Sequence, residues 1–301
     1  MKFSGAFTAL ITPFRRGAVD EEALKKLVKA QVSAGISGLV PCGSTGEAAT
    51  LSASEKERVV RVVAAAAAGR VPVVAGVGTN DTKKAVSDAR AAADWGADAL
   101  LVLAPYYNKP TQGGLFLHFK AVADAVKLPV VVYNIPGRTG VNIQPATLAR
   151  IASDCDNVLA VKEASGSLDQ VSEILTLTKG RLQVLSGDDS LTLPMMSVGA
   201  CGVVSVLSNI LPRETAALCR AALAGDYARA GRLHRKLFAL IRSLFLETNP
   251  IPVKAAAHAL GLCANELRLP LTPMSPEGWQ KLHRELERTG LLTPQARGRE
   301  G

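Results

Sequence analysis

The chain has 301 residues, of which 48% are hydrophobic and 20% are charged. This composition is typical of a globular protein and excludes a chain that is mainly disordered. The apolar runs are too short for a membrane-spanning helix. The apolar segment 3–14 contains Pro13 and precedes two arginines, which favours a first strand over a signal peptide.

The net charge of +9 raises the alternative of a basic nucleic-acid-binding protein. The excess is scattered over helical segments and the tail without interleaved aromatic residues, at Arg229, Arg232, Arg235, Arg297 and Arg299. This pattern favours solvated helix faces. The five cysteines form no CxxC pair and the four histidines no HExxH motif. A disulfide framework and a metal site are therefore disfavoured, and a reducing cytoplasm is expected.

Eight short apolar runs alternate with helix-period segments before residue 225. They predict strands over 6–11, 38–41, 71–77, 99–104, 129–135, 158–163, 183–186 and 202–206. The runs are continuously apolar, as in parallel strands buried on both faces. Predicted helices between them cover 21–34, 52–69, 81–95, 112–127, 145–153, 168–178 and 191–198. This α/β alternation indicates a (β/α)8 TIM barrel, because eight such units in roughly 220 residues match a closed barrel better than an open sheet. The glycine-rich fingerprint of a dinucleotide-binding sheet is also missing after the first strand.

The alternation stops near residue 225. Three further helices are predicted over 226–247, 253–261 and 276–289. We therefore expect a catalytic barrel over 1–224, a C-terminal three-helix unit over 225–293 and a frayed tail over 294–301.

Lys162 is the most informative residue at the carboxyl ends of the strands, where barrel enzymes build their sites. It follows the apolar residues 158–161 inside a strand. Burial favours the neutral amine, which is the nucleophile that forms a Schiff base with a ketone. The structural alternative is a buried ion pair with Glu163 or Asp188.

Three other features have both a functional and a structural interpretation. The turn Gly43–Gly46 offers N–H groups and hydroxyls to a small carboxylate, or is a plain β–α turn. Tyr133 is either a proton-transfer residue or a packed core tyrosine. Arg138 offers a bidentate fork to a carboxylate, or lies on the surface.

Several motifs occur together in the order and spacing of a known superfamily. They are Gly43-Ser44-Thr45-Gly46-Glu47, Pro105-Tyr106-Tyr107-Asn108, Tyr133-Asn134-Ile135-Pro136-Gly137-Arg138-Thr139-Gly140, Val161-Lys162-Glu163, Leu185-Ser186-Gly187-Asp188-Asp189 and Asn249-Pro250-Ile251-Pro252-Val253-Lys254. The chain resembles the pyruvate-dependent class I aldolases over nearly its whole length. Within them it is similar to the dihydrodipicolinate synthase family, a choice that rests mostly on Arg138.

The resemblance implies a role for each residue of a pyruvate site. Lys162 forms an imine with pyruvate, and the Thr45 side chain and the Ser44–Thr45 backbone hold the pyruvate carboxylate. Tyr133 transfers protons through the hydroxyls of Ser44 and Tyr107, the latter from the neighbouring subunit of a tight dimer. Where the family has threonine at position 44, this chain has serine, which keeps the hydroxyl and loses a methyl group.

The resemblance also implies the second substrate and the assembly. Arg138 binds the carboxylate of L-aspartate 4-semialdehyde, and the main chain at Gly187 and Val204 lines the pocket. The implied enzyme is a cytoplasmic lyase of lysine and diaminopimelate biosynthesis that uses no metal or organic cofactor. It forms a homotetramer of tight dimers and binds neither nucleic acid nor membrane. The alternative is a related aldolase acting on a 2-keto-3-deoxy sugar acid or N-acetylneuraminate.

Lysine-inhibited members of the family bind L-lysine in a dimer cleft with polar and acidic residues. The matching positions here are Ala48, Ala53, Lys56, Asn80, Lys84 and Tyr106. At an effective dielectric constant of 20, like charges about 5 Å apart repel by roughly 3 kcal/mol, so two lysines disfavour a ligand with two ammonium groups. We predict an enzyme that physiological L-lysine does not inhibit. An activity titration at pH 7–8 tests this, and half-inhibition below the millimolar range contradicts it.

Overall fold

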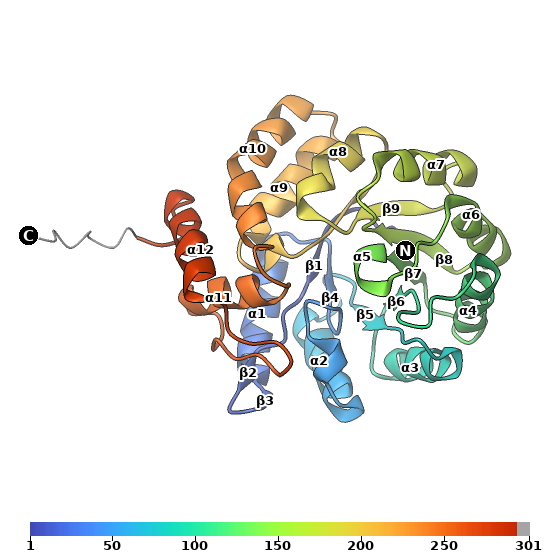
Figure 1. Cartoon of the computed structure of the whole chain (residues 1–301), viewed down its shortest axis with the longest axis horizontal. Helices are drawn as coiled ribbons and strands as arrows, with labels where there is room; N and C mark the ends of the chain where they lie inside the picture. The colour runs from blue at the N-terminus through green and yellow to red at the C-terminus, as the bar shows by residue number, and fades with distance from the viewer. Residues whose placement is uncertain (294–301) are drawn as a thin grey trace, which may run out of the picture.

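A computed structural model describes residues 1–293. Eight parallel strands form a barrel in the order β4–β1–β10–β9–β8–β7–β6–β5, and a parallel bridge between Leu39 and Val73 joins the two ends. The strands are β1 (Gly5–Ala9), β4 (Gly38–Val40), β5 (Val74–Val77), β6 (Ala99–Leu103), β7 (Val130–Asn134), β8 (Val158–Glu163), β9 (Gln183–Ser186) and β10 (Gly202–Ser205). Figure 1 shows the helices arranged around this barrel, which confirms the predicted fold.

Three of the helices that follow strands begin at the residues that the capping signals predict. Asp20 caps α1, Asp81 caps α3, and Ser52 and Glu55 form a capping box at the start of α2. The helices around the barrel are α1 (Glu21–Ser33), α2 (Ala53–Ala67), α3 (Thr82–Asp94), α4 (Gln112–Asp124), α5 (Pro136–Thr139), α6 (Pro145–Asp154), α7 (Leu168–Thr178), α8 (Thr192–Ser197) and α9 (Pro212–Leu223). Short 3₁₀ turns occupy Ala48–Thr50, Asp189–Leu191 and Leu207–Asn209.

Two details at the start of the chain differ from the prediction. Strand β1 ends at Ala9 rather than at residue 11, because its neighbour β4 ends at Val40, the register partner of Ala9. A hairpin of β2 (Phe14–Arg15) and β3 (Ala18–Val19) was not predicted from the sequence. Its turn, Arg16-Gly17, has φ values of 54° and 80°. Such turns usually carry Asn-Gly or Asp-Gly, so the usual sequence signal is missing.

The barrel has two apolar layers. One cluster fills its interior and includes Phe7, Leu101, Tyr133, Ala160 and Val204. A larger cluster lies between the strands and the helices. Because successive side chains of a strand point to opposite faces, residues such as Val132 and Val161 belong to the outer layer, and their neighbours face the interior. This alternation decides which polar side chains reach the site.

The three predicted C-terminal helices are present as α10 (Tyr227–Ser243), α11 (Ile251–Ala259) and α12 (Pro276–Arg288). Helix α12 packs against α10 and α11, and its Leu282 and Leu286 are fully buried. Helix α10 ends four residues earlier than residue 247, the predicted end. In Figure 1 these helices lie at one side of the barrel. The predicted tail, 294–301, lies outside the described residues.

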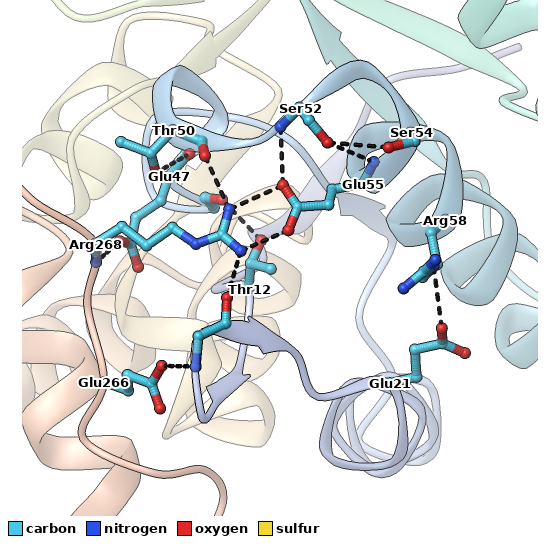
Figure 2. A network of polar contacts seen from close by, with 12 residues as sticks. Thr12, Glu21, Glu47, Thr50, Ser52, Ser54, Glu55, Arg58, Glu266 and Arg268 are labelled. Atoms are coloured by element: carbon cyan, nitrogen blue, oxygen red, sulfur yellow. Dashed lines mark hydrogen bonds and ion pairs between the residues drawn. The ribbon is translucent and has the colours of Figure 1, made fainter.

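Arg268, in the segment between α11 and α12, ties the C-terminal helices to the start of α2. Its guanidinium group donates to both carboxylate oxygens of Glu55 and to the carbonyl oxygens of Gly17 and Thr50, as Figure 2 shows for the labelled residues. The Arg268 guanidinium lowers the pKa of Glu55 to about 2.

We expect the Glu55–Arg268 pair to stabilise the protein in a pH-dependent way. The stabilisation is fully present above the ordinary glutamate pKa of 4.5 and is lost as the pH falls towards 2. Glu55→Gln should lower the free energy of unfolding by about 1 kcal/mol at pH 7, since the pair is partly exposed. Urea unfolding of both proteins at pH 7, 4 and 3 should show this difference shrinking. A constant difference contradicts the assignment.

Candidate active site

Tyr133 and Lys162 are register partners at the carboxyl ends of β7 and β8. Both side chains are buried, Lys162 with 7% of its surface exposed. The Lys162 Nζ atom lies 4.0 Å from the centroid of the Tyr133 ring. The predicted nucleophile and the predicted proton-transfer residue are therefore in contact.

The structural alternative for Lys162, a buried ion pair, is wrong. Within residues 1–293, Lys162 forms no ion pair with either predicted carboxylate. The Glu163 carboxylate accepts hydrogen bonds of 2.6–3.3 Å from nitrogen atoms of Asn134, Ser165 and Gln170. An oxygen of Asp188 accepts from the backbone and the hydroxyl of Ser190, both at 2.9 Å. Because Glu163 points out of the barrel, the Lys162 amine is left free for a substrate.

The loop after β4 carries Ser44 and Thr45 between two residues with left-handed backbone. Cys42 has φ 56° and Glu47 has φ 54°. This conformation costs an ordinary residue about 1–2 kcal/mol. Gly76 on β5 makes room for the loop, since a Cβ atom there would lie 2.2 Å from the Cys42 carbonyl oxygen. A strained loop built against a glycine favours a binding role over a plain turn.

Asn249 links both predicted carboxylate-binding residues, a role that was not predicted from the sequence. Its Nδ2 atom donates to Oγ1 of Thr45 at 2.9 Å, and its backbone carbonyl accepts from Nη2 of Arg138 at 3.0 Å. Asn249 is 8% exposed, and its Oδ1 atom is buried without a partner among residues 1–293. The only signal for it was a polar residue beside Pro250 within one of the motifs of the resemblance.

A cavity of about 590 Å³ opens at this end of the barrel. Its lining includes Ser44, Tyr133, Arg138 and Asn249. Arg138 belongs to the short helix α5 and is exposed at the cavity rather than on the outer surface. The loop, the aromatic residue and the arginine that the motifs single out therefore share one space.

Two predicted pocket residues lie in the barrel wall, and one of them, Gly187, lies beside Lys162. A Cβ atom at Gly187 would lie 2.6 Å from Cβ of Ala164 and 3.2 Å from Cε of Lys162, so only glycine fits there. Val204, on β10, packs in the same interior cluster as Tyr133. Their positions agree with a lining role for the main chain.

Tyr107 lies on the surface of the chain, away from the buried pair of Tyr133 and Lys162. Its side chain is 87% exposed and is not part of the cavity lining within residues 1–293. Its φ of 71° is left-handed, so the residue is held in an unfavourable conformation at the surface.

The same cavity extends to Lys56 and Lys84, the two residues whose positive charges are predicted to repel L-lysine. Lys84 Nζ lies 2.8 Å from an oxygen of Asp88, so a carboxylate offsets its charge. The predicted repulsion of L-lysine therefore depends mainly on Lys56.

The remaining reactive groups near the site are poor nucleophiles or ligands. Burial raises the pKa of the Cys42 thiol to about 12, which keeps it protonated at neutral pH. No group of three His, Cys, Asp or Glu residues within 1–293 could hold a metal ion. In the same part of the chain, no helix is both long enough and apolar enough to span a membrane.

The site is thus a buried amine in contact with a phenol, and this phenol lines the same cavity as a hydroxyl-bearing loop and an arginine, as in Schiff-base-forming barrel enzymes. The model of the dihydrodipicolinate synthetase family matches residues 2–289. The chain belongs to this family.

Relatives with known names or structures agree with this assignment. A 4-hydroxy-tetrahydrodipicolinate synthase of Nitratidesulfovibrio vulgaris (strain DP4) is 52% identical over 292 residues, which cover 97% of this chain and 100% of that protein. The dihydrodipicolinate synthase of Aquifex aeolicus is 50% identical, with a TM-score of 0.95 and coverage of 96% and 99%. The Acinetobacter baumannii enzyme, solved with pyruvate, is 40% identical, with a TM-score of 0.94 and coverage of 97% and 100%.

Proposed function

We propose that Lys162 is the residue through which this chain condenses pyruvate with L-aspartate 4-semialdehyde to 4-hydroxy-tetrahydrodipicolinate, in lysine and diaminopimelate biosynthesis. The observation that carries the proposal is the free Lys162 amine in contact with Tyr133 inside the barrel. Relatives about 50% identical over nearly the whole chain are named for this reaction.

The proposed chemistry needs only an amine and proton transfers. Lys162 attacks the pyruvate ketone, and loss of water gives an imine. A proton leaves the methyl group, and the resulting enamine carbon bonds to the aldehyde carbon of the second substrate. The amino group of that substrate then displaces Lys162 and closes the ring. Because the protonated imine accepts the electrons, the reaction requires no metal or organic cofactor.

The groups around Lys162 take the remaining roles. Tyr133 carries protons between the reacting atoms and solvent through the hydroxyl of Ser44. The Thr45 hydroxyl and the loop backbone hold the pyruvate carboxylate, and Asn249 orients Thr45 through the bond of 2.9 Å. Arg138 receives the carboxylate of the semialdehyde, supported by its position at the cavity and its anchor on the Asn249 carbonyl.

We further propose that the site is completed in a tight dimer, and that two dimers form a tetramer. The exposed, left-handed Tyr107 supports this arrangement, because a phenol held at the surface of one chain is available to the site of a partner. The substrates are small metabolites, which supports a cytoplasmic enzyme without nucleic-acid or membrane partners.

Borohydride trapping and turnover test the two substrate sites separately. Lys162→Ala should abolish the trapped pyruvate adduct and nearly all turnover, whereas Lys127→Ala, a change at an exposed lysine, should keep both.

Arg138→Ala should still trap pyruvate but lose about 2–5 kcal/mol of transition-state stabilisation in turnover of the semialdehyde. Turnover by Arg138→Lys should lie between that of the wild type and that of Arg138→Ala, because lysine keeps the positive charge but lacks the two-pronged guanidinium group. An adduct on another lysine, or unchanged turnover in Arg138→Ala, contradicts the assignment.

Subunit mixing tests the role of Tyr107. Tyr107→Phe should lower turnover by about 100-fold, the usual scale for losing a proton-transfer group. Mixed with Lys162→Ala, it should regain up to about a quarter of the wild-type activity, since half of the dimers carry one intact site. Demonstrated subunit exchange without recovery would show that Tyr107 does not act across the dimer.

A further inference from the structure

A buried ion pair joins the Gly43–Glu47 loop to the C-terminal helices. Nζ of Lys254, on α11, lies 2.6 Å from Oε1 of Glu47, and the two side chains are 0% and 1% exposed. The two residues are 207 positions apart in the chain. The pair therefore connects the end of the proposed pyruvate-binding loop to a helix that follows the barrel.

The other contacts of the pair also fix the loop. Oε2 of Glu47 accepts a hydrogen bond of 3.1 Å from the backbone N–H of Arg268, and Figure 2 shows these two residues side by side. Lys254 also donates to the carbonyl of Thr12 at 3.0 Å, and the Thr12 hydroxyl donates to the carbonyl of Gly46 at 2.7 Å. Because protein groups occupy both oxygens of Glu47, its carboxylate acts on the loop rather than on a substrate.

Stability alone does not account for this pair. Removing two charges from water costs about as much as their attraction returns, so apolar residues at such positions are often equally stabilising. Burial lowers the pKa of Lys254, and the Glu47 charge opposes that effect. The geometry at Glu47 does need support, because its φ of 54° is unfavourable for any residue with a side chain.

We propose that the Glu47–Lys254 pair is a positioning device for pyruvate binding. It holds Glu47 in the left-handed conformation and thereby keeps Ser44 and Thr45 where they bind the pyruvate carboxylate. Glu47 and Lys254 are positioning residues and touch no reacting atom. The inference rests on the proposed function, because it takes the loop as the pyruvate site.

The double variant Glu47→Gln/Lys254→Met separates positioning from stability. It removes both charges together, keeps an oxygen that accepts from the Arg268 N–H, and leaves no unpaired charge in the core. We expect its unfolding temperature to stay near that of the wild type. The pyruvate concentration for half-maximal borohydride trapping should rise about 10-fold to 100-fold, the scale of effect of a displaced binding group. Turnover at saturating pyruvate should fall as well, because the same loop carries the Ser44 hydroxyl of the proton relay, whereas the KM for the semialdehyde should change little.

The matched control is Glu55→Gln/Arg268→Met, which removes one acidic and one basic charge between the start of α2 and the segment that joins α11 to α12. It leaves the Arg268 backbone N–H in place, and the lost ion pair does not include the Gly43–Glu47 loop. We expect half-saturation by pyruvate to be unchanged in this control. A rise equal to that of the first double variant would indicate a general loosening of the C-terminal helices and overturn the proposal.

Two further outcomes separate the inference from the proposed function. A folded Glu47→Gln/Lys254→Met protein with wild-type half-saturation overturns the positioning role alone. If the double variant does not fold, the single variant Glu47→Asp, which keeps both charges and shortens the side chain by one methylene group, takes its place and should shift half-saturation in the same direction. A wild-type protein that traps no pyruvate refutes the proposed function, and the inference with it.

Discussion

The parallel pairing of Tyr133 with Lys162 is the constraint on which the rest of the site depends. Register partners on neighbouring parallel strands point to the same side of the sheet, and in this barrel that side is a narrow interior filled by side chains. A shift of β8 by one residue would move Lys162 into the outer layer and bring Glu163 inside. The one irregularity of the β7–β8 pairing lies at Val130 and Val131, away from the carboxyl ends. The register is therefore regular where it matters for catalysis.

The outer neighbours of the two inward residues hold that register. Asn134 follows Tyr133 and donates to the carboxylate of Glu163, which follows Lys162. Asn142 and Gln170 bond to each other and to this pair, so the polar cluster closes on itself behind the strands. A buried polar network is favourable only when its members are satisfied, and then it fixes a single arrangement. Here it also occupies the carboxylate that could have captured the Lys162 amine.

The C-terminal segment forms part of the active-site wall rather than an independent appendage. Asn249 contacts the groups proposed to bind both substrates, and Lys254 and Arg268 reach the loop after β4 through Glu47. Removing one partner of a buried ion pair typically costs about 3–5 kcal/mol, a large share of the roughly 5–15 kcal/mol that stabilises a folded domain. The helices after the barrel are thus tied to the site by contacts that the fold does not easily lose. Their contribution is to limit how the loop and Arg138 move.

The sequence by itself determined the eight strands, the capped helices and the inward lysine. Apolar runs, capping residues and the alternation of a strand are local patterns, and each depends on neighbours a few positions away. Only the tertiary structure decided which charges and amides meet. Asn249 lies 204 positions from Thr45, and Lys254 lies 207 from Glu47, so no local pattern records either contact. The sequence also left open whether the Lys162 amine is free or paired with Glu163. The packing of α7 on the barrel decides this, because it brings Gln170 to the Glu163 carboxylate. Periodicity specifies the direction of a side chain, and packing specifies what it meets.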